Sequence, residues 1–411
     1  MLVLSPLHEA AGFVVVGLWL GYVGYRIEYH RLPLWLYVAL IAKIFAAWFF
    51  GWLYASYYCH GDTLKAYLTA SRLAYYLWEV PADGLALLFR ELSPVWEAKG
   101  WRIFFQDIHL YGYDYEWSEP SSYFFYRLLL PLYLAGGGSY YGMQGLTAIT
   151  GGLLSYAAYR RWAQLSLFPS HFWVVWFLLP SGLLWTSGAL RDTFAVPLML
   201  YGMAWIANVQ SWRDLWGLLA LLVLAALRLE ALPLAVVGGM LYRWGNLWLL
   251  LAGAGAAVFA LGLFIGPWAY AYRAEALLPA IHPDIADAST FRLDYEPSFW
   301  GSLIGWLRAL PYGLLGPFPW QIQKPLVWLY GIETWGMAGL GAYYAWRSTW
   351  GLRQILLILM GIFVIGVVAM AMPYWGTLAR QKLYGIYFMA LGLGMVCEPL
   401  FKDRPDSLSE S

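Results

Sequence analysis

Long apolar runs with few polar interruptions are the dominant pattern along this chain. Residues 32–58 carry a single charged side chain, Lys43, and residues 247–270 carry none. A helix of about 20 apolar residues is long enough to cross the hydrocarbon core of a bilayer. Membrane barrels instead show alternating segments of about ten residues. The pattern therefore predicts an all-α polytopic membrane protein.

The apolar runs and the polar breaks between them predict about eleven transmembrane helices. These spans cover residues 9–25, 33–58, 139–159, 171–187, 189–208, 214–228, 231–243, 246–269, 325–346, 354–372 and 383–398. The two spans around residue 230 are short, and they could be half-helices or a re-entrant pair. We expect one transmembrane domain, residues 1–401, and a disordered cytosolic tail, residues 402–411.

Composition agrees with a membrane location. Hydrophobic residues make up 61% of the 411 residues and charged residues only 12%, too little charge to cover a water-soluble surface of this size. The formal net charge of +1 gives no basis for a nucleic-acid partner. Membrane lipids are the partners that the composition favours.

Basic residues in the short loops fall on one side of the membrane if the N-terminus is outside and the C-terminus is cytosolic. These residues are Arg26, Arg31, Arg160, Arg161, Arg213, Arg243, Arg347, Arg353, Lys402 and Arg404. The large loops 60–138 and 271–324 are then external, and they hold most of the acidic residues. This orientation requires residues 123–134 to form an interfacial or re-entrant helix on the outer surface.

Asp62 stands where the apolar run of residues 32–58 stops. Residues 63–79 place leucines and tyrosines at helical spacing among polar residues, which predicts an amphipathic helix on the membrane surface. A carboxylate held there could take a proton from a hydroxyl group. The alternative is a helix cap, because an aspartate before a helix accepts backbone N–H bonds. The two roles are compatible, and Asp62 is our candidate catalytic residue.

Residues 179–192 are the most unusual stretch, because a predicted span ends there in Pro, Ser, Gly and Thr and is followed at once by Arg191 and Asp192. Such a break exposes backbone donors beside a cation, an arrangement that suits a phosphate group. Ser187 and Arg191 are the candidate ligands. The alternative is a tight helical hairpin whose small residues pack closely while Arg191 snorkels to the interface.

Three more basic residues at span ends, Arg228, Arg380 and Lys382, are candidate phosphate ligands of the same kind. Each could instead simply anchor its span. Arg228 and Glu230 are two positions apart, so they would not face each other on one helix. Lys43, inside a span, has no evident partner.

Residues 311–320 contain three prolines and two glycines, which predicts that they do not form a regular helix. Irregular backbone at membrane depth needs protein or a cavity around it. We expect a re-entrant or surface segment that covers the outer side of the bundle.

Asp114 and Glu116 place two carboxylates at positions i and i+2 of an outer loop. In an extended segment both point to the same side and could hold a hard divalent cation such as Mg²⁺ or Mn²⁺. The alternative is a solvated acidic loop, because two carboxylates without a third ligand make a weak site. The six histidines show no metal-ligand spacing.

The order of these features resembles the membrane-embedded GT-C class of glycosyltransferases, which take sugars from polyprenyl-phosphate donors. The resemblance rests on a span followed by Gly61-Asp62, on amphipathic helices in a long first outer loop, and on a bundle of spans after it. Three further blocks resemble bacterial membrane proteins of surface-polysaccharide assembly, namely residues 180–192, 317–320 and 376–382. The chain departs from the class in an extra span before Asp62 and in an Asp114-x-Glu116 pattern in place of Asp-x-Asp, which leaves metal dependence open.

The resemblance implies catalysis by Asp62, the acidic residue of the first outer loop. It implies an enzyme of the bacterial inner membrane that moves a sugar from a lipid-linked donor to an acceptor on the outer face, in cell-surface polysaccharide or glycoconjugate assembly. Other polysaccharide-assembly proteins are then expected partners. Two alternatives stay open. One is a polymerase of prenyl-linked repeat units, in which arginines matter more than any carboxylate. The other is a transporter or a non-catalytic subunit. A transporter would require paired charges inside the membrane.

Overall fold

The computed structural model describes residues 6–30, 32–58, 62–89, 120–165, 172–208, 215–276, 291, 293–322, 325–347 and 351–396. Within these ranges every regular element is a helix, as the sequence predicts. By their internal contacts the residues group into two compact units. Unit 1 comprises residues 1–158, 183–202 and 213–234, and unit 2 comprises residues 159–182, 203–212 and 235–411. The tail 402–411 lies outside the described residues, and the single domain 1–401 stays a prediction.

Four helices in the described part of the chain are long and apolar enough to cross a membrane. They are Pro6–Tyr29, Leu34–Ser56, Leu251–Ala274 and Leu352–Ala371. Three shorter apolar helices are Asp192–Ala207, Leu215–Leu227 and Leu383–Gly394. These helices support an integral membrane protein. The count of about eleven spans is not confirmed by them and stays a prediction.

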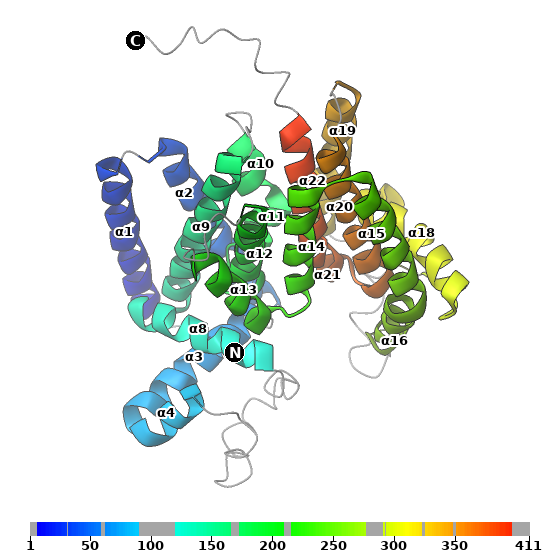
Figure 1. Cartoon of the computed structure of the whole chain (residues 1–411). Helices are drawn as coiled ribbons and strands as arrows, with labels where there is room; N and C mark the ends of the chain where they lie inside the picture. The colour runs from blue at the N-terminus through cyan, green and yellow to red at the C-terminus, as the bar shows by residue number, and fades with distance from the viewer. Residues whose placement is uncertain are drawn as a thin grey trace, which may run out of the picture. The chain divides into compact units, whose positions relative to one another are not determined.

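Unit 1 begins with α1 (Pro6–Tyr29) and α2 (Leu34–Trp52), and a π-helical turn, η1 (Leu53–Tyr58), extends α2. Two helices follow, α3 (Asp62–Glu79) and α4 (Pro81–Phe89), which lie below α8 in Figure 1. The other helices with residues in unit 1 are α8 (Pro120–Ala135), α9 (Tyr140–Leu165), α11 (Pro180–Trp185), α12 (Asp192–Ala207), α13 (Leu215–Leu227) and α14 (Ala231–Trp244).

The amphipathic helix predicted from residues 63–79 is confirmed as α3. Ala66, Ala70 and Leu73 form part of its buried face, at the four- and three-residue spacings of one helix side, and α3 packs against α8. Trp78, near the end of the helix, is 85% exposed. Tryptophan favours the boundary between water and lipid, so a position on the membrane surface remains our expectation for this helix.

Glu9 joins α1 to the start of α9. Its carboxylate accepts hydrogen bonds from Ser139 Oγ at 2.6 Å and from the backbone N–H groups of Tyr140 at 3.1 Å and Tyr141 at 3.0 Å. The first N–H groups of a helix have no partner within the helix, and its dipole favours a negative charge there. Gly12 allows this approach, because a methyl group at Gly12 would lie 2.0 Å from Ser139 Oγ.

Replacing Glu9 with glutamine is expected to destabilise unit 1 by about 1–3 kcal/mol, because the amide offers one acceptor oxygen where three donors converge. Thermal unfolding of the purified protein in nanodiscs measures the loss. Glu28→Gln is the matched control, since Glu28 is exposed near the other end of the same helix. Equal unfolding temperatures for the two variants would contradict the capping role of Glu9.

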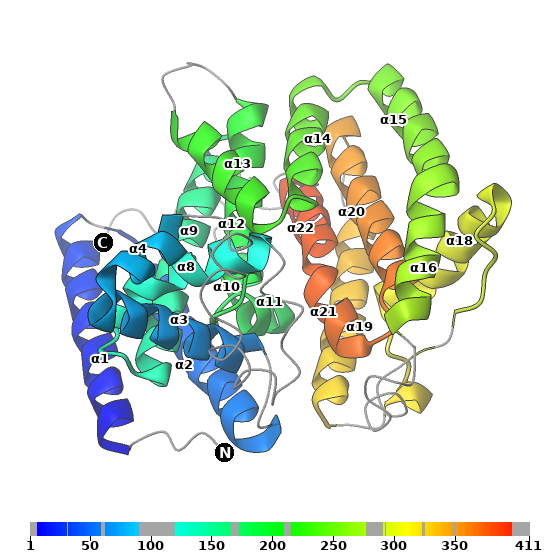
Figure 2. The ribbon, with the colours of Figure 1, turned by 90° about the horizontal axis from the view of Figure 1, so that it is seen from below.

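Unit 2 is built around α20 (Leu352–Ala371), which packs against α22 (Leu383–Val396) on one side and α18 (Phe299–Leu315) on the other, as Figure 2 shows. Gly361 and Gly385 let α20 and α22 approach closely, because a methyl group on either would lie 2.6 Å from the carbonyl oxygen of the other. The remaining elements are α10 (Phe172–Leu178), α15 (Leu247–Ala260), η2 (Leu261–Ile265), α16 (Gly266–Ala276), η3 (Pro319–Gln321), α19 (Pro325–Arg347) and α21 (Trp375–Gln381).

Two segments differ from the sequence prediction. The span expected over residues 171–187 is broken at Leu179 into α10 and α11, because the residue before a proline avoids helical backbone and Pro180 begins α11. Residues 311–315, expected to be irregular, instead complete α18, so Pro311 lies inside a helix. A proline removes one backbone hydrogen bond from a helix, and membrane helices tolerate this where neighbours satisfy the freed group.

Candidate functional site

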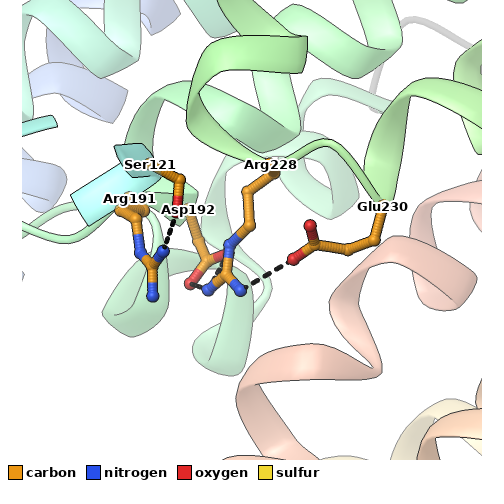
Figure 3. A network of polar contacts seen from close by, with 5 residues as sticks. All are labelled: Ser121, Arg191, Asp192, Arg228 and Glu230. Carbon is orange, nitrogen blue, oxygen red and sulfur yellow. Dashed lines mark hydrogen bonds and ion pairs between the residues drawn. The ribbon is translucent and has the colours of Figure 1, made fainter. Parts of the chain in front are cut away.

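Three helix N-termini meet around the start of α12 in unit 1. Asp192 begins α12, Ser121 lies in the first turn of α8, and the turn from Arg228 to Glu230 leads into α14 (Figure 3). Each N-terminus carries a partial positive charge from its unpaired N–H groups. The meeting of several N-termini favours negatively charged groups at this place.

Arg228 ties the starts of α12 and α14 together. Its Nη2 lies 3.4 Å from both carboxylate oxygens of Asp192, and its Nη1 lies 3.0 Å from Glu230 Oε1. Asp192 is fully buried, whereas the Glu230 side chain is 67% exposed. The expectation that Arg228 and Glu230 do not face each other was wrong, because α13 ends at Leu227 and the two residues lie in a turn rather than on one helix.

Arg191, a candidate phosphate ligand, directly precedes Asp192. Its Nη1 donates a hydrogen bond to Ser121 Oγ at 2.8 Å, so it holds the start of α8 near the start of α12 (Figure 3). The side chain is only partly buried. A guanidinium in this position can meet the oxygens of an approaching phosphate while the nearby N-termini add to the attraction.

Lys43 holds the beginning of the segment that leads to Arg191. The Nζ atom donates to the carbonyl oxygen of Thr186 at 2.9 Å and to Thr186 Oγ1 at 2.7 Å. The expectation that Lys43 has no evident partner was wrong, because the partner lies 143 positions away in the sequence. Ser187, the next residue and another candidate ligand, is fully buried and donates its hydroxyl to Leu183 O. A phosphate contact by Ser187 would therefore require this hydroxyl to change partner.

Gly188 brings the start of α3 beside the same segment. A methyl group on Gly188 would lie 3.6 Å from Thr63 Cγ2. Thr63 follows Asp62 and shares a hydrogen bond of 2.8 Å with the Tyr140 hydroxyl, which fixes the start of α3 against α9. The sequence singles out the stretch around Asp62 and residues 179–192, and the structure brings Thr63 of the first beside Gly188 of the second within unit 1.

Asp62 is partly buried and begins α3, one residue before the predicted start. A carboxylate in the first turn of a helix is stabilised by the helix dipole, which agrees with the helix-start alternative and leaves the catalytic one open. Residues 59–61 lie outside the described residues. Further along α3, burial raises the pKa of Tyr67, so its hydroxyl stays protonated and donates to Gly138 O at 3.3 Å.

Arg380 and Lys382 belong to unit 2, at the end of α21. Lys382 is buried, and its Nζ donates to Gly313 O at 3.3 Å and to Thr334 Oγ1 at 3.1 Å. Its contacts are thus with protein groups. Arg380 is partly buried and lies in the last turn of the helix. A phosphate-binding role for either residue stays a prediction.

Glu333 makes a partly buried polar contact that the sequence reasoning missed. Its carboxylate in α19 accepts hydrogen bonds from Ser181 N at 2.9 and 2.8 Å and from Ser181 Oγ at 2.8 Å, and it attracts Lys382. The sequence contained a feature that could have identified it, because Glu333 is the one acidic residue of the predicted span 325–346. An ionisable residue inside such a span usually has a partner or a function.

Among the described residues, no group of three or more His, Cys, Asp or Glu side chains is placed to hold a metal ion. Asp114 and Glu116 lie outside those residues, so the expected alternative of a Mg²⁺ or Mn²⁺ site stays a prediction. Comparison with protein-family models, with curated proteins and with solved structures finds no match. The function is therefore inferred from the chain itself.

Proposed function

We propose that the chain is an integral membrane glycosyltransferase that moves a sugar from a polyprenyl-phosphate-linked donor to an acceptor on the outer face of the membrane. The observation that carries this proposal is the position of Arg191 where the starts of α8 and α12 meet, in the unit whose α3 begins with Asp62. A guanidinium beside helix N-termini suits the phosphate of the donor. A carboxylate at the start of α3, which lies beside Gly188 of the segment leading to Arg191, suits the removal of a proton from the acceptor.

In the proposed reaction the acceptor hydroxyl oxygen bonds to the anomeric carbon of the sugar while the bond from that carbon to the phosphate oxygen breaks. Asp62 takes the hydroxyl proton, and the phosphate leaves as an anion on its prenyl chain. Arg191 stabilises the negative charge that develops on the leaving oxygen. Attack and departure occur on opposite faces of the sugar, so the anomeric configuration inverts.

The sequence suggests Arg228 as a phosphate ligand, whereas in this proposal Arg228 is a structural residue. Because its guanidinium is occupied by Asp192 and Glu230, it holds the turn between α13 and α14 against the start of α12. It therefore supports the site without contacting the donor. Arg191 remains as the ligand of the phosphate in unit 1.

The topology belongs to the proposal as well. About eleven spans, an external N-terminus and a cytosolic C-terminus would place the basic short loops in the cytosol. The outer face of the bacterial inner membrane would then hold Asp62 and the acceptor. Cell-surface polysaccharide or glycoconjugate assembly is the process in which we place the reaction, with other assembly proteins as partners.

Replacing Arg191 with alanine is expected to weaken the binding of polyprenyl phosphate by about 10- to 100-fold, the loss expected for one charge-assisted contact to an anion. Native mass spectrometry or fluorescence titration of the nanodisc-embedded protein measures the affinity. Arg243→Ala is the matched control, since Arg243 is an exposed arginine at the end of α14. Equal affinities of the two variants would contradict the phosphate-binding role of Arg191.

A transporter is the second candidate, and two observations favour it. Asp192 and Arg228 form a buried ion pair in unit 1, and Glu333 attracts Lys382 in unit 2. Paired charges among apolar helices are typical of substrate and ion pathways. Release of a prenyl phosphate and a glycosylated product from the purified protein would support the transferase, whereas uptake of a sugar or ion into proteoliposomes without product would support the transporter.

A polymerase of prenyl-linked repeat units shares the phosphate site of the transferase. It would depend on Arg191 and tolerate the loss of the Asp62 carboxylate. The arginine contacts around α12 agree with both enzymes. The length of the product distinguishes them, because a polymerase extends a chain of repeat units while the transferase adds one sugar.

A further inference from the structure

Lys43 is a charged residue enclosed by an apolar helix bundle. It lies in the middle of α2 and is 2% exposed, among buried neighbours that include Leu40, Ile44 and Ala47. Gly152 of α9 faces its stem, because a methyl group on Gly152 would lie 3.3 Å from Lys43 Cδ. The ammonium group is thus held away from water by α2 and α9.

Stability alone does not account for a lysine at this position. Both acceptors that the structure gives its Nζ atom belong to Thr186, and both are uncharged. Moving an ammonium group out of water is unfavourable, and neutral hydrogen bonds offset this only in part. An apolar side chain of similar length would fit the same bundle at least as well.

The contact of Lys43 falls on the segment that carries Arg191. Thr186 is the first residue after α11, and Arg191 follows five positions later. Gln144 of α9 fixes the middle of this segment by accepting a hydrogen bond from Ala189 N at 2.7 Å. The segment is therefore fixed at its start by Lys43 and in its middle by Gln144, without a regular helix of its own.

We propose that Lys43 is a positioning residue, which fixes residues 186–190 and thereby sets the place of the Arg191 guanidinium. The nature of the ligand of Arg191 rests on the proposed function, but the positioning of the segment does not. Lys43 acts through two directed hydrogen bonds to one residue, which an apolar side chain cannot replace. Small displacements of a binding group weaken its action strongly.

Lys43→Met tests this role, because methionine has a similar length and no hydrogen-bond donor. In nanodiscs the variant is expected to keep its unfolding temperature, to exchange the amide hydrogens of residues 188–190 at least about tenfold faster, and to bind polyprenyl phosphate about tenfold more weakly. Lys43→Arg, which keeps the charge and the donors, is expected to restore part of the affinity. Gly17→Ala on α1 is the control, since a methyl group there meets no atom within 4 Å.

Unchanged exchange at residues 188–190 in Lys43→Met would overturn the proposal. Faster exchange throughout unit 1 together with a lower unfolding temperature would also overturn it, because Lys43 would then serve the stability of the bundle only. If the methionine variant does not fold, Thr186→Val tests the positioning role by the same exchange measurement. This substitution removes the Thr186 hydroxyl that accepts a hydrogen bond from Lys43. Faster local exchange in a protein whose wild type binds no polyprenyl phosphate would support the positioning role and contradict the proposed function.

Discussion

Replacing Asp62 with asparagine is expected to lower the rate of sugar transfer by about 10²- to 10⁴-fold, the usual contribution of a general base. Asparagine has nearly the same shape and keeps an acceptor oxygen for the helix start, but it cannot take a proton. The affinity for polyprenyl phosphate should change by less than about threefold, because the phosphate contacts Arg191 in our proposal. The loss should therefore appear in the turnover rate.

The measurement is transfer of a labelled sugar from a prenyl-linked donor by the nanodisc-embedded protein. Glu79→Gln is the matched control, since it removes an exposed carboxylate at the other end of α3. We expect the control to keep wild-type turnover. Full activity of Asp62→Asn would show that another group is the base, and activity with extended products would favour the polymerase.

Replacing Asp192 with alanine is expected to destabilise the protein by about 3–5 kcal/mol, because it leaves the buried Arg228 guanidinium without its buried partner. Glu230 compensates little, since it is 67% exposed and shared with water. Glu230→Ala should accordingly lower the stability by less than about 1 kcal/mol. The two variants remove the two partners of the same arginine, so they form a matched pair.

Unfolding in nanodiscs measures the stability of both variants. Adding Arg228→Met to Asp192→Ala should recover most of the loss, because the double variant leaves no unpaired buried charge. Equal losses for Asp192→Ala and Glu230→Ala would contradict the importance of burial for this pair. A double variant less stable than Asp192→Ala alone would show that Arg228 stabilises the unit by contacts other than its ion pairs.

The periodicity of the chain predicted its helices, because local spacing is enough to define an amphipathic or an apolar helix. The prediction of α3 from residues 63–79 is an example, since Leu64, Tyr67 and Leu68 stand at three- and four-residue spacing. The α18 helix was missed for a local reason as well. The three prolines from Pro311 onward suggested irregular backbone, while the start signal at Ser298, whose side chain accepts from Gly301 N at 3.1 Å, was overlooked.

The contacts of the candidate site could not be predicted in the same way, because they join residues that are distant in the sequence. Lys43 and Thr186 are 143 positions apart, and Asp192 and Arg228 are 36 apart. Arg228 and Glu230 are close, but their contact depends on where α13 ends. Helix boundaries are the least certain part of a sequence-based prediction.

What the sequence did provide was the choice of residues to consider. Asp62, Arg191 and Arg228 were singled out because a charge at the end of an apolar run needs a reason. The structure brings the segment carrying Arg191 beside the start of α3. Ser187 was singled out because it lies in the break of residues 179–192, and the structure gives both Ser187 and Arg228 protein partners.

The most direct test of the central claim is a cryo-electron microscopy structure of the nanodisc-embedded protein with added polyprenyl phosphate. We expect elongated lipid density whose phosphate lies within hydrogen-bonding distance of the Arg191 guanidinium. The position that the sugar of a donor would occupy, next to this phosphate, should face Asp62. The prenyl chain should run along the apolar helices. A phosphate bound away from the start of α12, or a site that stays empty at saturating lipid, would contradict the account.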